Sequence, residues 1–183
     1  MITVSLVNKI FSVGIIAGQV FILAAMAYLF LFRAKKNVVA NFIARHGLLL
    51  AFVVALLSTA GSLFYSEIAG FEPCKLCWFQ RIFMYPQVVL LGLALWKHDK
   101  NIRDYAIGLS GIGALIAGYH YLLQFGMAPS VACSAVGYSI SCSKFFAVNF
   151  GYITIPMMAL TAFVLIIIFL IFSRLVNYDK ASR

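Results

Sequence analysis

Long apolar stretches separated by short polar segments dominate this chain of 183 residues. A helix needs about 20 apolar residues to cross the roughly 30 Å hydrocarbon layer of a membrane. None of the stretches shows the alternation over about ten residues that marks a membrane-spanning β-strand. The pattern therefore predicts an all-α integral membrane protein, a four-helix transmembrane bundle with an extra N-terminal transmembrane helix. The predicted spans are Ile10–Phe32, Gly47–Ser66, Phe79–Trp96, Tyr105–Phe125 and Gly151–Ser173.

The first stretch, Ile10–Phe32, allows two interpretations. Ala25–Ala27 has the small-x-small form of a signal-peptidase site, and Lys9 precedes the apolar run. The apolar residues nevertheless continue past that site, and cleavage there would leave the basic segment Arg33–Arg45 outside the cell. We therefore expect this stretch to be retained as an anchor helix.

The composition changes the picture in two ways. Hydrophobic residues make up 64% of the chain and charged residues only 10%, whereas soluble domains are nearer half apolar and a quarter charged. This excludes a soluble globular protein and a disordered chain. The net charge of +9 does not indicate a nucleic-acid partner, because the basic residues lie in short clusters between apolar runs.

The basic residues also predict an orientation, since lysine and arginine accumulate in cytoplasmic segments. If every apolar stretch spans the membrane, most of the lysine and arginine residues fall on one side of it. We assign that side to the cytoplasm. The N-terminus, Glu67–Trp78 and Gly126–Phe150 then lie outside, and all four cysteines lie with them. The cytoplasmic set is Arg33, Lys35, Lys36, Arg45, Lys97, Lys100, Arg103, Arg174, Lys180 and Arg183, against Lys9, Lys75, Arg81 and Lys144 outside.

The cysteines form two pairs along the sequence, Cys74 with Cys77 and Cys133 with Cys142. A C-x-x-C pair closes almost no loop, which makes it a weak structural staple, and such pairs are known as redox-active dithiols. The alternatives are two structural disulfides, which oxidising compartments permit, or a Cys₄ zinc site. The eight residues between the second pair are a wide spacing for zinc. We favour thiol–disulfide exchange without a metal.

Arg81 follows Cys77 by four residues, so the two share a helix face if a helix has begun there. A cation and a helix N-terminus both favour thiolate over thiol, and a guanidinium can stabilise negative charge on a carbonyl-bearing acceptor. An arginine that extends to the membrane interface is the alternative. Since the chain has no haem, iron–sulfur or flavin motif, we expect a lipid-soluble quinone as the two-electron acceptor. The pair in the longer loop would exchange with a soluble partner.

The segment Pro73–Pro86, PCKLCWFQRIFMYP, resembles the signature of the DsbB disulfide-bond formation family, most closely its BdbC branch. Gly61–Ile68 and Gly151–Pro156 resemble that branch as well, and the resemblance covers roughly residues 47–172. It implies a membrane thiol–disulfide oxidoreductase that reoxidises an extracytoplasmic thioredoxin-like thiol oxidase of the DsbA/BdbD type. The electrons would pass to quinone, either ubiquinone or menaquinone. Such an enzyme supports disulfide bond formation in exported proteins at the bacterial inner membrane.

The resemblance also implies roles for individual residues. Cys74 and Cys77 match the quinone-linked pair, with Cys77 in contact with the quinone, and Arg81 matches the arginine beside the quinone head. Cys133 and Cys142 match the loop pair, and their order in the chain makes Cys133 the partner in the mixed disulfide.

His120 lies within an apolar stretch, at a depth comparable to that of Arg81. An intramembrane histidine is a functional candidate by default, and this one could bond a quinone oxygen or pass its proton. A packed histidine bonded to a neighbouring helix is the alternative. Trp78, Tyr65 and Tyr152 are expected in the aromatic belt at the membrane interface.

The predicted organisation has three parts. Residues 1–46 form an anchor helix and a basic cytoplasmic loop, which the four-span family body lacks. Residues 47–173 form a DsbB-like four-helix redox domain, and residues 174–183 form a cytoplasmic tail. The rival function is a small multispan membrane scaffold with structural disulfides or a Cys₄ zinc site.

Overall fold

The computed structural model describes residues 2–32, 38–99, 101–129, 142, 143, 145, 148 and 150–181. Cys133, most of the loop around it and the segment 33–37 lie outside the described residues. The regular elements assigned within the described residues are all helical. They are α1 (Ile2–Phe32), α2 (Val38–Leu63), the π-helical turn η1 (Phe64–Ile68), α3 (Lys75–Lys97), α4 (Ile102–Gln124) and α6 (Ile155–Ala181).

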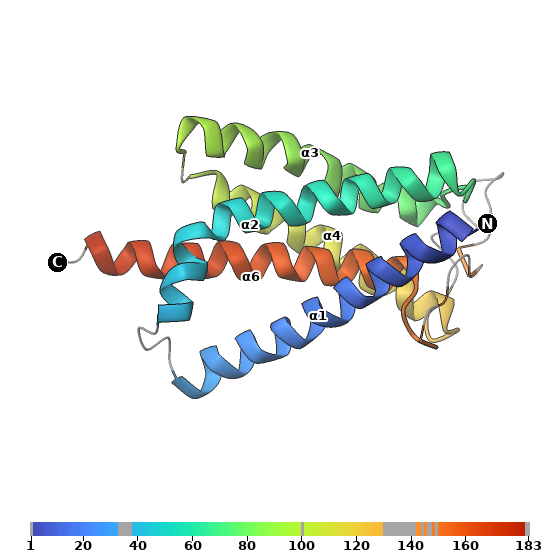
Figure 1. The fold of residues 1–183 in the computed structure, drawn as a ribbon, viewed down its shortest axis with the longest axis horizontal. Helices are drawn as coiled ribbons and strands as arrows, with labels where there is room; N and C mark the ends of the chain where they lie inside the picture. The colour runs from blue at the N-terminus through green and yellow to red at the C-terminus, as the bar shows by residue number, and fades with distance from the viewer. Residues whose placement is uncertain are drawn as a thin grey trace.

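Five of the described helices are long and apolar enough to cross a membrane, which confirms the predicted fold class. Successive long helices run in alternating directions (Figure 1). The start of α1 and the ends of α2 and α4 therefore lie at one end of the bundle, and the end of α6 lies at the other. The candidate spans are Val4–Tyr28, Asn41–Ile68, Lys75–Lys97, Ile102–Gln124 and Ile155–Arg174.

The last helix, α6, is the centre of the bundle. Phe163, Ile166 and Leu170 of α6 are fully buried in one apolar cluster with residues of α2, α3 and α4. The ring of Phe163 packs so close to α4 that a Cβ atom on Gly113 would overlap it. Small residues permit this close approach between helices in lipid, where water provides no driving force between them.

Only some of the small residues of α4 permit close helix packing, and these lie on one face of the helix. Gly113 and Ala117 face the bundle and are buried. Gly108, Gly111 and Gly118 have no atom within 4 Å of an added Cβ. The composition of α4 indicates that the helix can pack closely against a neighbour. The contact of Gly113 with Phe163 in the structure shows which face of α4 does so.

The N-terminal helix α1 lies along one side of α6 (Figure 1). The ring of Phe21 is 5.3 Å from that of Phe169, and Ala25 is buried against α6. A polar link reinforces the contact: Tyr152 donates a hydrogen bond to Gln19 (2.9 Å), and Gln19 donates to Thr161 (3.4 Å). This anchoring gives α1 a defined position beside the other helices.

Candidate redox-active site

The C-x-x-C pair sits at the start of α3. Cys74 is the N-cap residue in an extended conformation, and its carbonyl accepts a hydrogen bond from the Trp78 amide at 3.1 Å. Cys77 is then the third residue of the helix, and side chains at the N-cap and at this position approach each other. The two sulfur atoms are 3.3 Å apart, and both residues are free thiols. The helix begins two residues before Cys77, so Arg81 lies on the same face one turn deeper.

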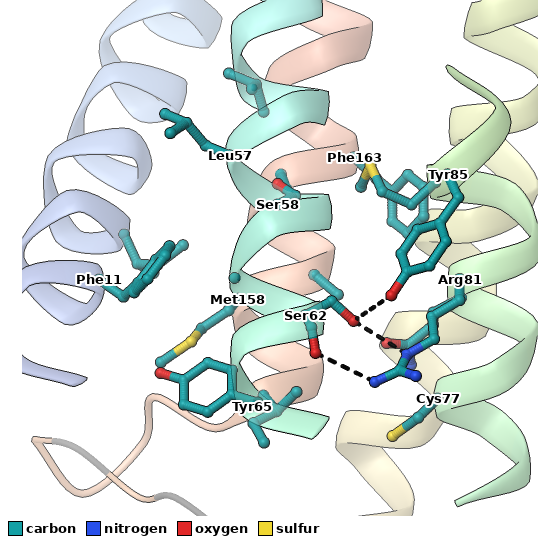
Figure 2. Close-up of a pocket in the computed structure, with 18 of the residues that line it drawn as sticks. Phe11, Leu57, Ser58, Ser62, Tyr65, Cys77, Arg81, Tyr85, Met158 and Phe163 are labelled. Carbon is teal, nitrogen blue, oxygen red and sulfur yellow. Dashed lines mark hydrogen bonds between the residues drawn. The ribbon is translucent and has the colours of Figure 1, made fainter. Parts of the chain in front are cut away.

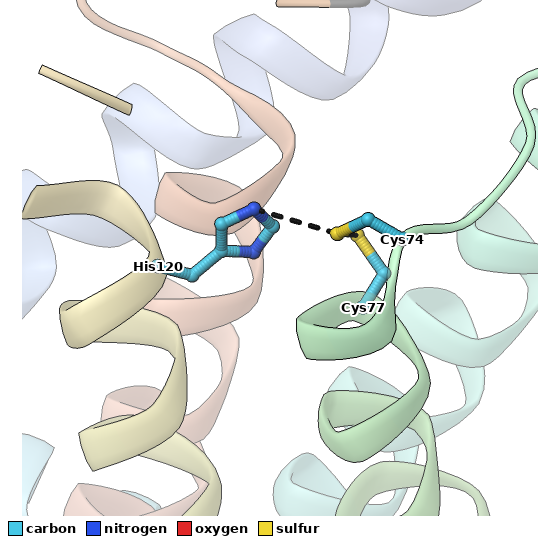
Figure 3. A group of neighbouring side chains, drawn as sticks. All are labelled: Cys74, Cys77 and His120. Atoms are coloured by element: carbon cyan, nitrogen blue, oxygen red, sulfur yellow. Dashed lines mark hydrogen bonds between the residues drawn. The ribbon is translucent and has the colours of Figure 1, made fainter. Parts of the chain in front are cut away.

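His120 of α4 lies beside this pair (Figure 3). Its Nε2 is 3.6 Å from Cys74 Sγ and 3.1 Å from the carbonyl oxygen of Cys142. The Gln80 amide lies 3.1 Å from Nδ1. Because a carbonyl oxygen can only accept, Nε2 carries a proton that it donates to the Cys142 carbonyl. The imidazole thus connects the C-x-x-C pair to the segment that carries the second pair.

Cys142 lies in the same region. It is buried with Cys74 in one apolar cluster that also contains Leu76 and Leu123. Cys142 is disulfide-bonded, and its predicted partner, Cys133, lies outside the described residues. A disulfide at Cys142 is inconsistent with a Cys₄ zinc site in this structure, because a bonded sulfur is not a thiolate ligand.

Three of the described residues nevertheless lie close enough together to hold a metal ion. One ligand atom each from Cys74, Cys77 and His120 lies within 4.8 Å of the others. Two thiolates and an imidazole are ligands that zinc accepts. Metal content is therefore a necessary control in any assay of the thiols.

The surroundings of Cys74 favour its thiolate. Cys74 precedes the membrane-spanning segment of α3. The hydrogen bond from Cys77, followed by the hydrogen bond and charge of His120, lowers the pKa of Cys74 from 9.0 to about 4 despite its burial. The sequence links a stabilised thiolate to Cys77 through Arg81. In the structure the thiolate-favouring contacts instead lie on Cys74 and come from Cys77 and His120, whereas Arg81 bonds to Ser62 of α2.

The reduced protein is expected to keep Cys74 ionised far below neutral pH. Because its pKa is lower when folded, the thiolate stabilises the folded reduced protein fully at pH values above the ordinary thiol pKa. This stabilisation declines as the pH falls and is lost below the folded pKa of about 4. Ultraviolet absorbance of the thiolate and chemical denaturation across this pH range measure both effects.

Two histidine variants make this prediction specific. His120→Gln removes the imidazole and is expected to move the pKa of Cys74 upward. His46→Gln is the matched control, because His46 lies on α2 and contacts the carbonyl of Phe42 instead. The prediction would be contradicted if the thiolate absorbance of the wild-type protein disappeared, as the pH is lowered, already near the ordinary pKa of a thiol.

Cys77 faces a cavity of about 430 Å³. The cavity is lined mainly by apolar side chains of α1, α2, α3 and α6, and Figure 2 shows Cys77, Arg81 and Tyr85 along one side of it. Polar side chains gather near Cys77, where Gln80, Arg81 and Ser62 also line the wall. The thiol therefore adjoins a space that suits a ligand with a polar head and an apolar remainder.

Arg81 is held in place by α2. Its Nε donates to Ser62 Oγ at 3.1 Å, and its Nη2 donates to the Ser62 carbonyl at 3.2 Å. Tyr85 also donates to Ser62 Oγ (3.1 Å), and the guanidinium carbon lies 5.2 Å from the centre of the Trp78 ring. These contacts direct Arg81 into the bundle wall, and its other guanidinium N–H groups donate no hydrogen bond to a described residue.

The structure brings some predicted site residues together and separates others. Cys77 and Arg81 share the cavity, whereas His120 is not among the described residues that line it and contacts Cys74 instead. Of the three residues expected at the membrane interface, Trp78 is 55% exposed and Tyr152 is 37% exposed. Tyr65 was expected there too, but it is buried at 6% exposure because Phe71 stacks on its ring.

Sequence reasoning missed three residues of the cavity wall. Ser62 and Tyr65 belong to a segment that carries the family resemblance, but no spacing rule pairs them with α3. Tyr65 lies on the π-helical turn η1, a rare geometry that is frequent at functional sites. Gln80 had a usable signal, because a polar residue inside an apolar span is a functional candidate.

The fold and this site together define a class: a multi-pass helical membrane protein that carries a C-x-x-C thiol pair beside an apolar cavity. The profile of the family described as "Disulfide bond formation protein DsbB" matches residues 44–173. The chain belongs to this family. It is therefore a membrane oxidoreductase of disulfide bond formation, and the family implies a thiol-oxidase partner.

Individual relatives agree with the family match. The chain is 46% identical over 121 residues to a probable disulfide formation protein C of Bacillus cereus, covering 66% of this chain and 86% of the relative. It is 45% identical over 125 residues to disulfide bond formation protein C of Bacillus subtilis, with the same two coverages. A probable disulfide formation protein of Metapseudomonas resinovorans is 44% identical over 129 residues, covering 69% and 88%. No solved structure matches this chain.

Proposed function

We propose that this protein takes electrons from an extracytoplasmic thioredoxin-like thiol oxidase of the DsbA/BdbD type and passes them to a quinone in the bacterial cell membrane. The observation that carries the proposal is the position of Cys77. Its sulfur is 3.3 Å from that of Cys74, and the same residue lines the apolar cavity with Arg81. Cys77 therefore belongs to the C-x-x-C pair and also lines the cavity in which an acceptor would bind.

The donors around the cavity fit a quinone. Arg81 provides a positive charge at the wall near Cys77. Tyr65 also lines the cavity, and its buried hydroxyl has no hydrogen-bond partner among the described residues. A buried donor without a partner is costly, and a carbonyl oxygen of a ligand would satisfy it. A quinone held by these residues would supply an acceptor for two electrons and two protons.

Two thiol–disulfide exchanges move the electrons to the C-x-x-C pair. A thiolate of the partner attacks the disulfide of Cys133 and Cys142 to give a mixed disulfide, and the partner's second thiolate resolves it. The partner leaves oxidised, and the loop pair becomes a dithiol. That dithiol attacks the disulfide of Cys74 and Cys77 and re-forms its own. Each exchange breaks one S–S bond and forms one.

The chain's own residues then favour release of the electrons at the cavity. Closing the Cys74–Cys77 bond releases two electrons and two protons. The Arg81 guanidinium is positioned to stabilise negative charge that develops on an acceptor oxygen. His120, between Cys74 Sγ and the Cys142 carbonyl, holds the two segments in contact.

The distribution of charge supports an extracytoplasmic position for the cysteines. The described cysteines lie at the end of the bundle where α2 leads into α3 and α4 leads toward α6 (Figure 1). At the opposite end, Lys97 is the last residue of α3, Arg103 lies in the first turn of α4, and Arg174 pairs with Asp104 of that turn. Lysine and arginine favour the cytoplasmic side, so the thiols would face the compartment where disulfides form.

The decisive experiment is an anaerobic assay with purified protein, a reduced thioredoxin-like partner and a quinone. We expect quinol and oxidised partner to form in equal amounts, with metal-free protein as active as untreated protein. A scaffold would instead show inert disulfides or a stoichiometric metal. Unchanged quinone in the presence of a fully reduced partner would refute the proposal.

A further inference from the structure

The N-terminal helix α1 lies outside the region matched by the family profile, which begins at residue 44. It nevertheless lines the cavity that contains Cys77, through Ile10, Phe11, Gly14 and Ile15. In Figure 2 Phe11 lies across the view from Cys77 and Arg81, with Ser58 and Ser62 of α2 between them. The cavity therefore extends from the thiol to a helix that the family domain does not contain.

Phe11 fits closely against α2. The end of its ring lies 2.9 Å from the position of a Cβ on Gly61, so the absence of a side chain there makes room for it. Its ring centre is 6.2 Å from that of Tyr65. This contact joins α1 to the π-helical turn that positions the Tyr65 hydroxyl. The N-terminal helix is thus fitted to the cavity wall rather than loosely adjacent to it.

One turn further along α1, the cavity has room. Gly14 lines it, and no atom lies within 4 Å of a Cβ built on this residue. Gly18, a turn beyond, has Leu165 of α6 only 3.0 Å from the same position. Gly14 is itself exposed, so the cavity is open beside this residue, and α1 closes against α6 at Gly18.

The polarity of the cavity changes between its two ends. The end near Cys77 carries Arg81 and Ser62, whereas the end at α1 carries Ile10, Phe11 and Ile15, with the Tyr65 hydroxyl as a single polar group beside Phe11. An occupant with a polar head and a long hydrocarbon tail matches this change. A tail along α1 would keep its apolar surface in contact with protein over the full length of the cavity.

We propose that α1 is the wall that binds the isoprenoid tail of the quinone, with Phe11 and Gly14 as the contact residues. The inference rests on the proposed function and adds to it a specificity element outside the family domain. The polar head would meet Arg81 near Cys77, and the tail would leave along the space at Gly14. A helix added to the four-span body thereby favours acceptors with a long tail.

Direct binding tests this inference without relying on turnover. Gly14→Leu fills the space along the tail and is expected to weaken binding of a long-tail quinone about tenfold, equal to the loss of about two buried methylene groups. It should leave binding of a tail-less quinone with the same head at the wild-type level. Gly111→Leu on α4 is the matched control, because that position is equally open and lies outside the cavity lining.

Photo-cross-linking locates the tail independently of any variant. A long-tail quinone with a photoreactive group along its chain should label residues 10–15, as identified by mass spectrometry. Phe11→Ala should reduce that labelling, and a circular dichroism melt confirms that each variant is folded. Labelling confined to α3 and α4, or equal losses for both quinones with Gly14→Leu, would overturn the inference.

The outcomes separate the inference from the proposed function. If a phospholipid chain fills the α1 end instead, the long-tail quinone will bind no tighter than the tail-less one, which also overturns the inference. Reduction of quinone by the wild-type protein would persist in that case. Failure of the wild-type protein to bind or reduce either quinone would refute the proposed function itself.

Discussion

Replacing Cys77 by serine is expected to reduce electron transfer to quinone to the uncatalysed rate. Cys77 is the only cysteine among the described residues that lines the cavity, and its sulfur lies 3.3 Å from Cys74. Without it the C-x-x-C pair cannot form a disulfide, so two electrons have no route to the acceptor. Anaerobic quinol formation with a reduced partner and with a small dithiol measures the loss, which should be complete with both donors.

Cys133→Ser provides the matched comparison. We expect this variant to lose oxidation of the protein partner but to retain reduction of quinone by a small dithiol, because the small donor reacts with the C-x-x-C disulfide directly. Each variant carries one cysteine-to-serine change, so general effects on the protein are balanced. Equal loss with both donors in the Cys133 variant would contradict the division of labour between the two pairs.

Replacing Arg81 by methionine is expected to raise the KM for quinone roughly 10- to 100-fold. A hydrogen bond to a charged group contributes about 1.5–3 kcal/mol, and each 1.4 kcal/mol corresponds to a factor of ten. The KM for the thiol partner should stay unchanged, because the partner reacts with the loop pair. Steady-state kinetics with each substrate varied in turn separate the two effects.

Two further variants distinguish charge from packing at Arg81. Arg81→Lys retains a cation but not the planar fork that bonds Ser62 through two N–H groups, so we expect an intermediate KM. Ser62→Ala removes the Oγ contacts with Arg81 and Tyr85 and keeps the guanidinium. If Ser62→Ala matches the methionine variant in KM, the arginine acts by bracing α2 against α3 rather than by its charge.

The membrane-spanning helices can be predicted from short segments of sequence, because each one is recognised by its own run of apolar residues. The predicted span Tyr105–Phe125 corresponds to α4 at Ile102–Gln124, and the predicted span Gly151–Ser173 corresponds to the first part of α6. Hydropathy over some 20 residues decides whether a segment suits lipid, so no distant contact is needed to recognise it. The predicted span Phe79–Trp96 corresponds to α3 at Lys75–Lys97, which begins one turn before the predicted start and includes Cys77 in that turn.

The partners of the site residues could not be predicted in the same way. Arg81 and Ser62 are 19 residues apart and bond across two helices, and His120 reaches Cys74 over 46 residues. Such contacts depend on the rotation of each helix about its axis. That rotation is set by packing details such as the ring of Phe163 against Gly113.

The sequence by itself determined that this is a helical membrane protein with a reactive C-x-x-C pair followed by an arginine, because apolar length and residue spacing are properties of one segment at a time. Only the tertiary structure decided that His120 supports Cys74, that Tyr65 is buried in the cavity wall, and that α1 completes that wall. These three results depend on how separate helices face one another, and burial within the bundle selects that arrangement.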